Sequence, residues 1–134
     1  MTTHLLLPLR LRPGDELRPA IEAAVYASGH GAAFVVSGIG SLDRLRLRLA
    51  GAETLLNRDA DFEMLSLAGS IAANGSHLHI SVSDAAGQVL GGHVAPGCRV
   101  RTTAEILLAL LPGHQLSREP DPATGYAELM IRPA

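Results

Sequence analysis

Residues 76–94 read SHLHISVSDAAGQVLGGHV, two apolar-rich stretches joined by a short turn. In the first stretch Leu78, Ile80 and Val82 fall at every second position, the periodicity of a strand with one buried face. The residues from Asp84 to Gly87 are of types that favour turns, and they lead into the second stretch. The segment therefore predicts an antiparallel β-hairpin.

On either side of this hairpin the chain predicts one helix and further strands. From Leu17 to Val25 the apolar residues follow the spacing of an amphipathic helix, with Asp15 as its cap and Gly29 at its end. The segment from Val100 to Leu111 is open between helix, by propensity, and strand, which its two threonines favour. The other predicted strands are Leu5–Leu11, Ala32–Ile39, Leu42–Leu49, Met64–Ala73 and Tyr126–Ile131.

The strands differ in the burial that their patterns predict. The run from Ala32 to Ile39 is continuously apolar, as a strand covered on both faces would be. In Leu42–Leu49 three leucines alternate with three arginines, which indicates a half-buried strand. Glu63, Leu65 and Leu67 lie at every second position of the strand, so Glu63 is expected to point inward with the leucines unless a bulge intervenes. Together these patterns predict a single α+β domain over residues 1–134, a mostly antiparallel sheet (sandwich or open barrel) with one principal helix.

Composition narrows the environment and the partners. The 134 residues carry a net charge of −2, and aromatic residues are 3% of the chain, so composition gives little attraction for nucleic acid. No apolar run approaches the roughly 20 residues that span a bilayer, and the start lacks a secretory pattern. The single cysteine, Cys98, has no internal disulfide partner. A cytoplasmic protein is expected.

Three histidines give the hairpin its chemistry. His77 and His79 lie two residues apart, so both side chains leave the face opposite to the leucine and isoleucine. With the turn centred on Ala86, His79 and His93 lie directly across from each other, and His77 is the diagonal neighbour of His93. Three imidazoles on such a patch could converge on one ion at Zn–N distances of about 2.0–2.1 Å. A register slip of one residue would destroy the arrangement.

The metal prediction leaves alternatives open. Gly91 and Gly92 allow a close backbone approach or a bulge beside His93. Three histidines with an open fourth position suit a divalent transition metal, with zinc as first choice and nickel, iron or cobalt as alternatives. Without a metal, the same residues would form a solvated polar strand face, or would be hydrogen-bonded at a subunit interface.

Short motifs spread over nearly the whole chain carry a resemblance to a known family. They are Pro13-Gly14-Asp15-Glu16-Leu17, Gly38-Ile39-Gly40-Ser41, Phe62 to Ser70, His77-Leu78-His79-Ile80-Ser81, Gly87, Gly91-Gly92-His93 and Thr103-Ala104-Glu105. Together they resemble the plants-and-prokaryotes conserved (PPC) domain family. That resemblance implies an α+β fold that assembles as a homotrimer, with His77, His79 and His93 in the positions of metal ligands. Stand-alone prokaryotic members of the family are commonly described as predicted DNA-binding proteins.

One departure from the plant members concerns DNA. Their AT-hook needs an Arg-Gly-Arg-Pro core to enter the minor groove. This sequence has Arg18-Pro19 and Arg132-Pro133 without that core. Any DNA binding is therefore expected to be weak or indirect.

Other polar residues have simpler interpretations. The stripe formed by Arg44, Arg46 and Arg48 is interpreted as a solvated or intersubunit face rather than a phosphate-binding one. Cys98 is interpreted as a structural residue, and Glu105 as a candidate carboxylate that accepts a hydrogen bond from a ligand histidine and orients its ring. The remaining histidines, predicted to be isolated surface residues, are His4, His30 and His114.

Three functional hypotheses follow. The first is a homotrimer whose tri-histidine metal faces a small-molecule ligand or water, where the ion would act as a Lewis acid or lower the pKa of bound water. The second is a DNA-associated protein, and the third is a structural trimer that the metal merely stabilises. No membrane partner is expected.

Overall fold

The protein folds around an antiparallel sheet with a single helix, as the sequence predicts. In the computed structural model, residues 5–134 are described. The sheet is not a closed barrel, and the α+β class is confirmed. The elements are β1 (Leu6–Leu11), α1 (Leu17–Ala27), β2 (Ala33–Arg48), β3 (Leu56–Arg58), β4 (Phe62–Ala72), β5 (Gly75–Ser83), β6 (Val89–Val94), β7 (Arg99–Leu110), β8 (His114–Asp121) and β9 (Tyr126–Pro133).

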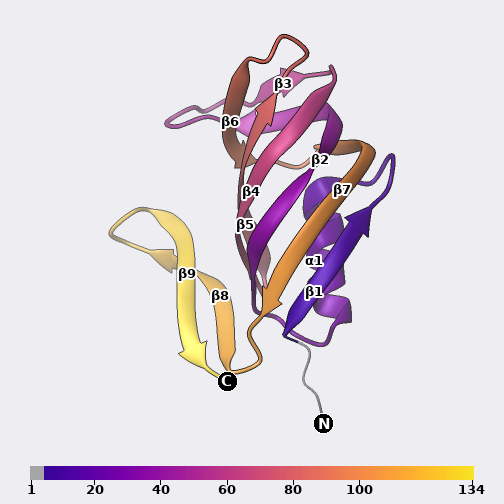
Figure 1. The fold of residues 1–134 in the computed structure, drawn as a ribbon. Coiled ribbons are helices and arrows are strands. Elements are labelled where there is room, and N and C mark those ends of the chain that lie inside the picture. The colour runs from indigo at the N-terminus through magenta and orange to yellow at the C-terminus, as the bar shows by residue number, and fades with distance from the viewer. Residues whose placement is uncertain (1–4) are drawn as a thin grey trace.

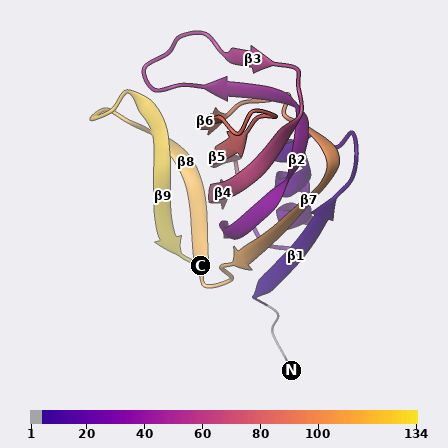
Figure 2. The ribbon, with the colours of Figure 1, turned by 45° about the horizontal axis from the view of Figure 1, so that its top comes forward.

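Seven strands form the main sheet, in the order β1-β7-β2-β4-β5-β6 with β3 beside β2. The last strand of this path, β6, also pairs with the end of β2, through Leu47 with Val94 and Arg48 with His93. The sheet therefore curls at this end, where Figure 2 shows the long β2 bending. The curl brings the predicted hairpin of β5 and β6 next to Arg48.

The core lies between the sheet and the helix, which covers one face beside β1 and β7 (Figure 1). Leu17, Ile21 and Val25 of α1 are fully buried against it. The predicted cap at Asp15 is wrong, because its carboxylate accepts the backbone N–H of Arg12 at 2.8 Å and the helix starts without a side-chain cap. The helix end is as predicted, since Gly29 has a φ of +84°.

The other face of the sheet is open in the single chain. The prediction that Ala32–Ile39 is covered on both faces is wrong for the single chain, because residues 34, 36, 37 and 39 are exposed. We call the exposed apolar residues of β2 and β4 the open face: Phe34, Val36, Ile39 and Leu65 are 39%, 56%, 53% and 49% exposed. Glu63 is exposed as well, because a register shift between Met64 and Ser66 changes the parity of β4.

Strands β8 and β9 pair only with each other and form an arm, residues 114–133 (Figures 1 and 2). The sequence pattern predicts the strand β9 of this arm, but it does not predict β8. Leu116 anchors it in a small cluster with Ala32 and Ala72. The side-chain amide of Asn74 also bonds the backbone of Arg118, donating at 2.9 Å and accepting at 2.7 Å. Across residues 5–134, no helix is long and apolar enough to cross a membrane.

Candidate metal centre

The hairpin of β5 and β6 has the register that the sequence predicts. His79 pairs directly with His93, and the turn between the strands is closed by Asp84. Its carboxylate accepts the backbone N–H groups of Ala86 and Gln88, each at 2.9 Å. The intervening apolar residues of β5 are buried, so the histidines leave the opposite face of the strand.

The three imidazoles lie close enough together to share one ion. The Nε2 atoms of His77 and His79 are 3.0 Å apart, and the ligand nitrogens of His77, His79 and His93 all lie within 4.8 Å of one another. Two nitrogens bound to one tetrahedral zinc at about 2.0–2.1 Å are separated by about 3.3 Å. Small side-chain rotations therefore suffice to bring the three nitrogens into coordination distance.

Two of the histidines are held in the neutral form. Burial, with Arg48 and His77 as the next causes, lowers the pKa of His93 to about 4. Burial and the neighbouring His79 also lower the pKa of His77, and Arg118 adds to the effect. Neutral imidazole is the form that binds a metal, so these two side chains have the required protonation state at neutral pH.

The glycines before His93 allow the strands to approach each other. A Cβ atom on Gly91 would lie 2.4 Å from the carbonyl oxygen of Ile80, and one on Gly92 would lie 2.9 Å from that of Arg48. The pairing of β5 with β6 runs through both glycines without a register shift. Of the two predicted roles, the structure thus has the close approach and not the bulge.

A cavity of about 920 Å³ opens beside the histidines, between the main sheet and the arm. A smaller cavity of about 200 Å³ lies against His77 and His79 on the side of Phe34. His77 and His79 line both cavities and therefore lie between the large cavity and Phe34 of the open face. Apart from the histidines, the charged residues that line the large cavity are Arg18, Arg48, Glu53, Arg118 and Glu128, and its polar lining residues include Asn74, Ser76 and Tyr126.

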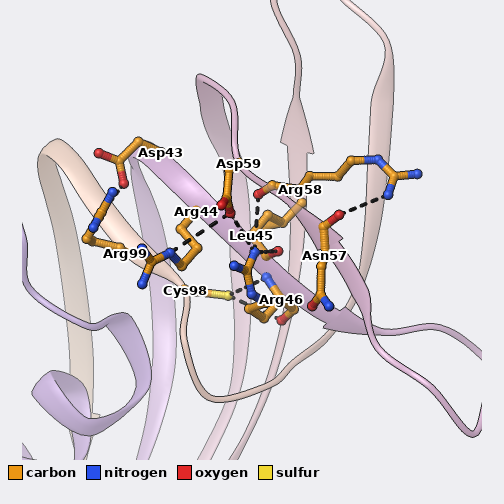
Figure 3. A network of polar contacts seen from close by, with 9 residues as sticks. All are labelled: Asp43, Arg44, Leu45, Arg46, Asn57, Arg58, Asp59, Cys98 and Arg99. Carbon is orange, nitrogen blue, oxygen red and sulfur yellow. Dashed lines mark hydrogen bonds and ion pairs between the residues drawn. The ribbon is translucent and has the colours of Figure 1, made fainter.

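The three arginines of the β2 stripe, Arg44, Arg46 and Arg48, differ in whether they form ion pairs. In Figure 3, Arg44 and Arg46 both point toward Asp59, with nitrogen–oxygen distances of 3.9 and 2.8 Å. A neighbouring pair joins Arg99 to Asp43 at 2.7 Å. Arg48 has no ion pair or side-chain hydrogen bond within residues 5–134, and it lies opposite His93. Sequence reasoning treated the three arginines alike, and the spacing alone held no signal that separates them.

The other candidates lie elsewhere. Cys98 is fully buried, bonds the backbone of Arg46, and burial raises its thiol pKa, as suits a structural residue. Glu105 is exposed on β7, paired with Arg10 and Ile39, and lines neither cavity. It could orient a ligand histidine only across a contact between copies. His30 is half-buried and His114 exposed, while His4 lies outside the described residues.

Comparison with known proteins places the fold. The model of the Plants and Prokaryotes Conserved (PCC) domain, called PPC above, matches residues 4–112. A Bifunctional protein GlmU of Synechococcus sp. is 48% identical in an alignment of 131 residues that covers 96% of this chain. The alignment covers only 20% of that relative, so this chain spans about a fifth of its length.

Solved structures agree with the family match. A hypothetical protein from Salmonella enterica has a TM-score of 0.92 at 41% identity, covering 96% of this chain and 93% of its own. A metal-containing protein from Archaeoglobus fulgidus has a TM-score of 0.82 at 26% identity, covering 93% and 92%. A proposed DNA-binding protein from Bacteroides thetaiotaomicron has a TM-score of 0.83 at 20% identity, covering 97% and 94%, and shows the fold alone.

The fold and the site together define a small α+β protein with a three-histidine candidate metal centre on a curled antiparallel sheet. The chain belongs to the Plants and Prokaryotes Conserved domain family.

Proposed function

We propose that this protein is a cytoplasmic, single-domain homotrimer in which His77, His79 and His93 hold one divalent transition-metal ion, with zinc as first choice. The open side of the ion would face a small-molecule ligand or water in the large cavity. The observation that carries the proposal is the convergence of three ligand nitrogens within 4.8 Å beside that cavity.

The donor set fits such an ion. Imidazole nitrogen suits zinc and the neighbouring transition metals, and two of the three groups have lowered pKa values. Within residues 5–134, no fourth histidine, cysteine or acidic side chain joins the group. Three protein ligands with a free position are typical of catalytic rather than structural zinc. A bound ion would supply Lewis-acid chemistry at that position.

The open face supports self-association. Its four apolar side chains lie uncovered on β2 and β4, and Phe34 lines the smaller cavity together with His77 and His79. Several large apolar side chains exposed on neighbouring strands are typical of an interaction surface. A second and a third copy of the chain on this face would cover the patch and would bring the histidines close to the subunit contact.

A DNA-associated role is the weaker alternative. It draws on the fold shared with a proposed DNA-binding protein. Against it, the chain has a net charge of −2, and Asp59 engages both Arg44 and Arg46 (Figure 3). Arginines already paired with a carboxylate offer little to a phosphate backbone, whose binding depends on unpaired positive charge.

Metal analysis of purified protein tests the proposal. The wild type, His79→Ala, the triple variant His77→Ala/His79→Ala/His93→Ala and the control His114→Ala are purified side by side. We expect the wild type and the control to carry equal metal and the triple variant to lose it. The single His79→Ala change should lower the content because this residue is both the partner of His77 and the one opposite His93.

Circular dichroism decides whether a loss of metal is specific. The three histidines leave the face opposite to the core, so the triple variant should keep the wild-type spectrum. If it carries as much tightly bound metal as the wild type, the histidines are not ligands and the proposed function is wrong.

A further inference from the structure

Arg48, at the end of β2, is exposed to solvent and lines the large cavity. It pairs directly with His93 across β2 and β6, so the two side chains leave the same face with Cβ atoms about 4.5–5.5 Å apart. The arginines two and four residues earlier both engage Asp59, and Arg48 has no such partner within residues 5–134. Its side chain is exposed and lines the cavity on the side of His93.

Arg118 reaches the same place from the arm. Its guanidinium donates to the hydroxyl of Ser70 at 2.9 Å, and Ser70 is the residue of β4 directly opposite His77. The two bonds from Asn74 fix its backbone, so the side chain is positioned from both ends. The PCC family model matches residues 4–112, so Arg118 lies outside the matched part of the chain.

The acidic residues of the cavity leave both arginines without an ion pair. Arg18, which also lines the cavity, forms an ion pair with Glu22 at 3.4 Å, and Glu22 is not a lining residue. Glu53 and Glu128 line the cavity, but within residues 5–134 neither lies within 4.0 Å of the guanidinium of Arg48 or Arg118. Glu128 interacts with Arg118 electrostatically, although it forms no ion pair with it. Arg48 and Arg118 thus keep guanidinium donors free of ion pairs in a concave site beside a cluster suited to a divalent cation, and such a site can attract an anion.

Resting on the proposed function for the ion beside it, we propose that this cavity binds a small molecule bearing a phosphate or carboxylate group, which Arg48 and Arg118 hold next to the three histidines. The guanidinium fork matches both groups, because each offers two oxygens to parallel N–H donors. Small-molecule sites measure about 300–1,000 Å³. The cavity, at about 920 Å³, has room for the body of the ligand as well as its anionic group.

Titration calorimetry on the full chain tests the inference, with inorganic phosphate and acetate as separate probes. Arg48→Gln and Arg118→Gln each remove one proposed contact. Arg44→Gln is the matched control, because it removes the same charge from the same strand as Arg48 but outside the cavity. We expect each cavity variant to weaken binding about tenfold or more, as for the loss of a charged hydrogen bond. The control should bind as the wild type does.

The outcomes separate this inference from the proposed function. Binding that depends on both arginines supports the anion site, and the tighter of the two probes distinguishes phosphate from carboxylate. If the wild type holds metal through its histidines but binds neither probe at millimolar concentration, the anion site is wrong and the metal site stands. The anion site is also wrong if Arg44→Gln weakens binding as much as Arg48→Gln. Arginine-dependent binding in a protein without histidine-bound metal would instead remove the metal proposal alone.

Discussion

Replacing Gly91 by alanine tests whether the close approach of β5 and β6 holds the candidate metal centre together. The new Cβ atom would lie 2.4 Å from the carbonyl oxygen of Ile80, and ordinary contact begins at 3.4 Å. The strands must therefore separate locally by about 1 Å, which lengthens ladder hydrogen bonds of about 2.9 Å beyond a useful distance. His93, two residues along β6, would move away from His79.

The cost combines two effects. Overpacking costs about 1–3 kcal/mol, and each weakened backbone hydrogen bond adds about 0.5–1.5 kcal/mol. We expect the free energy of unfolding to fall by about 2–4 kcal/mol in total. With an unfolding entropy of about 2.1 cal/mol/K per residue over 134 residues, Tm should drop by about 7–14 °C.

Thermal unfolding followed by circular dichroism measures this drop, with Gly113→Ala as the control. A Cβ atom on Gly113 would have no neighbour within 4 Å, and the φ of Gly113 is not positive. The Tm of Gly113→Ala should therefore stay within about 2 °C of the wild-type value. Metal content is measured on the same samples, and it should fall in Gly91→Ala only. If both variants melt together and hold equal metal, the close approach does not control the site.

Three further predictions concern assembly, DNA and the arm. Light scattering at micromolar concentration should give the mass of a trimer, and a monomer would contradict the role given to the open face. A shift assay at physiological salt should find only weak, non-specific DNA binding, and nanomolar sequence-selective binding would contradict this. Hydrogen bonds from Arg132 and Ser117 hold the pKa of Glu119 at about 2. Because this lies below the usual 4.5, the pair stabilises the arm above about pH 4.5, and the contribution is lost as the pH falls toward 2. In Arg132→Gln, an NMR titration should return the Glu119 pKa toward its usual range, and an unchanged value would show that the pair is not the cause.

The hairpin of β5 and β6 could be predicted because its information is local. The alternation of Leu78, Ile80 and Val82 fixes which face is buried, and the short turn fixes the register. The pairing of His79 with His93 follows from those two facts alone. The helix stripe from Leu17 to Val25 was predictable for the same reason, since its spacing is a local property.

The rest of the fold depends on residues far apart in the sequence. The register shift in β4 reversed the expected orientation of Glu63, and β2 runs unbroken through Gly40, where two strands were predicted. A Cβ atom at Gly40 would lie 2.4 Å from the carbonyl oxygen of Thr103, a contact that no local pattern reveals. The roles of Arg48 and Arg118 likewise depend on Asp59, Ser70 and the position of the arm.

The pairing of β1 with β7 has a consequence for the chain as it is made. Leu6 is paired with Ala109, so β1 is synthesised about a hundred residues before the strand with which it pairs in the sheet. At about 5–20 residues per second, β1 waits roughly 5–20 s for that partner. The two strands that carry His77, His79 and His93 are complete before β7 is synthesised. A nascent chain halted before Arg99 would thus already contain all three histidines, while β1 would still lack β7, the strand with which it pairs.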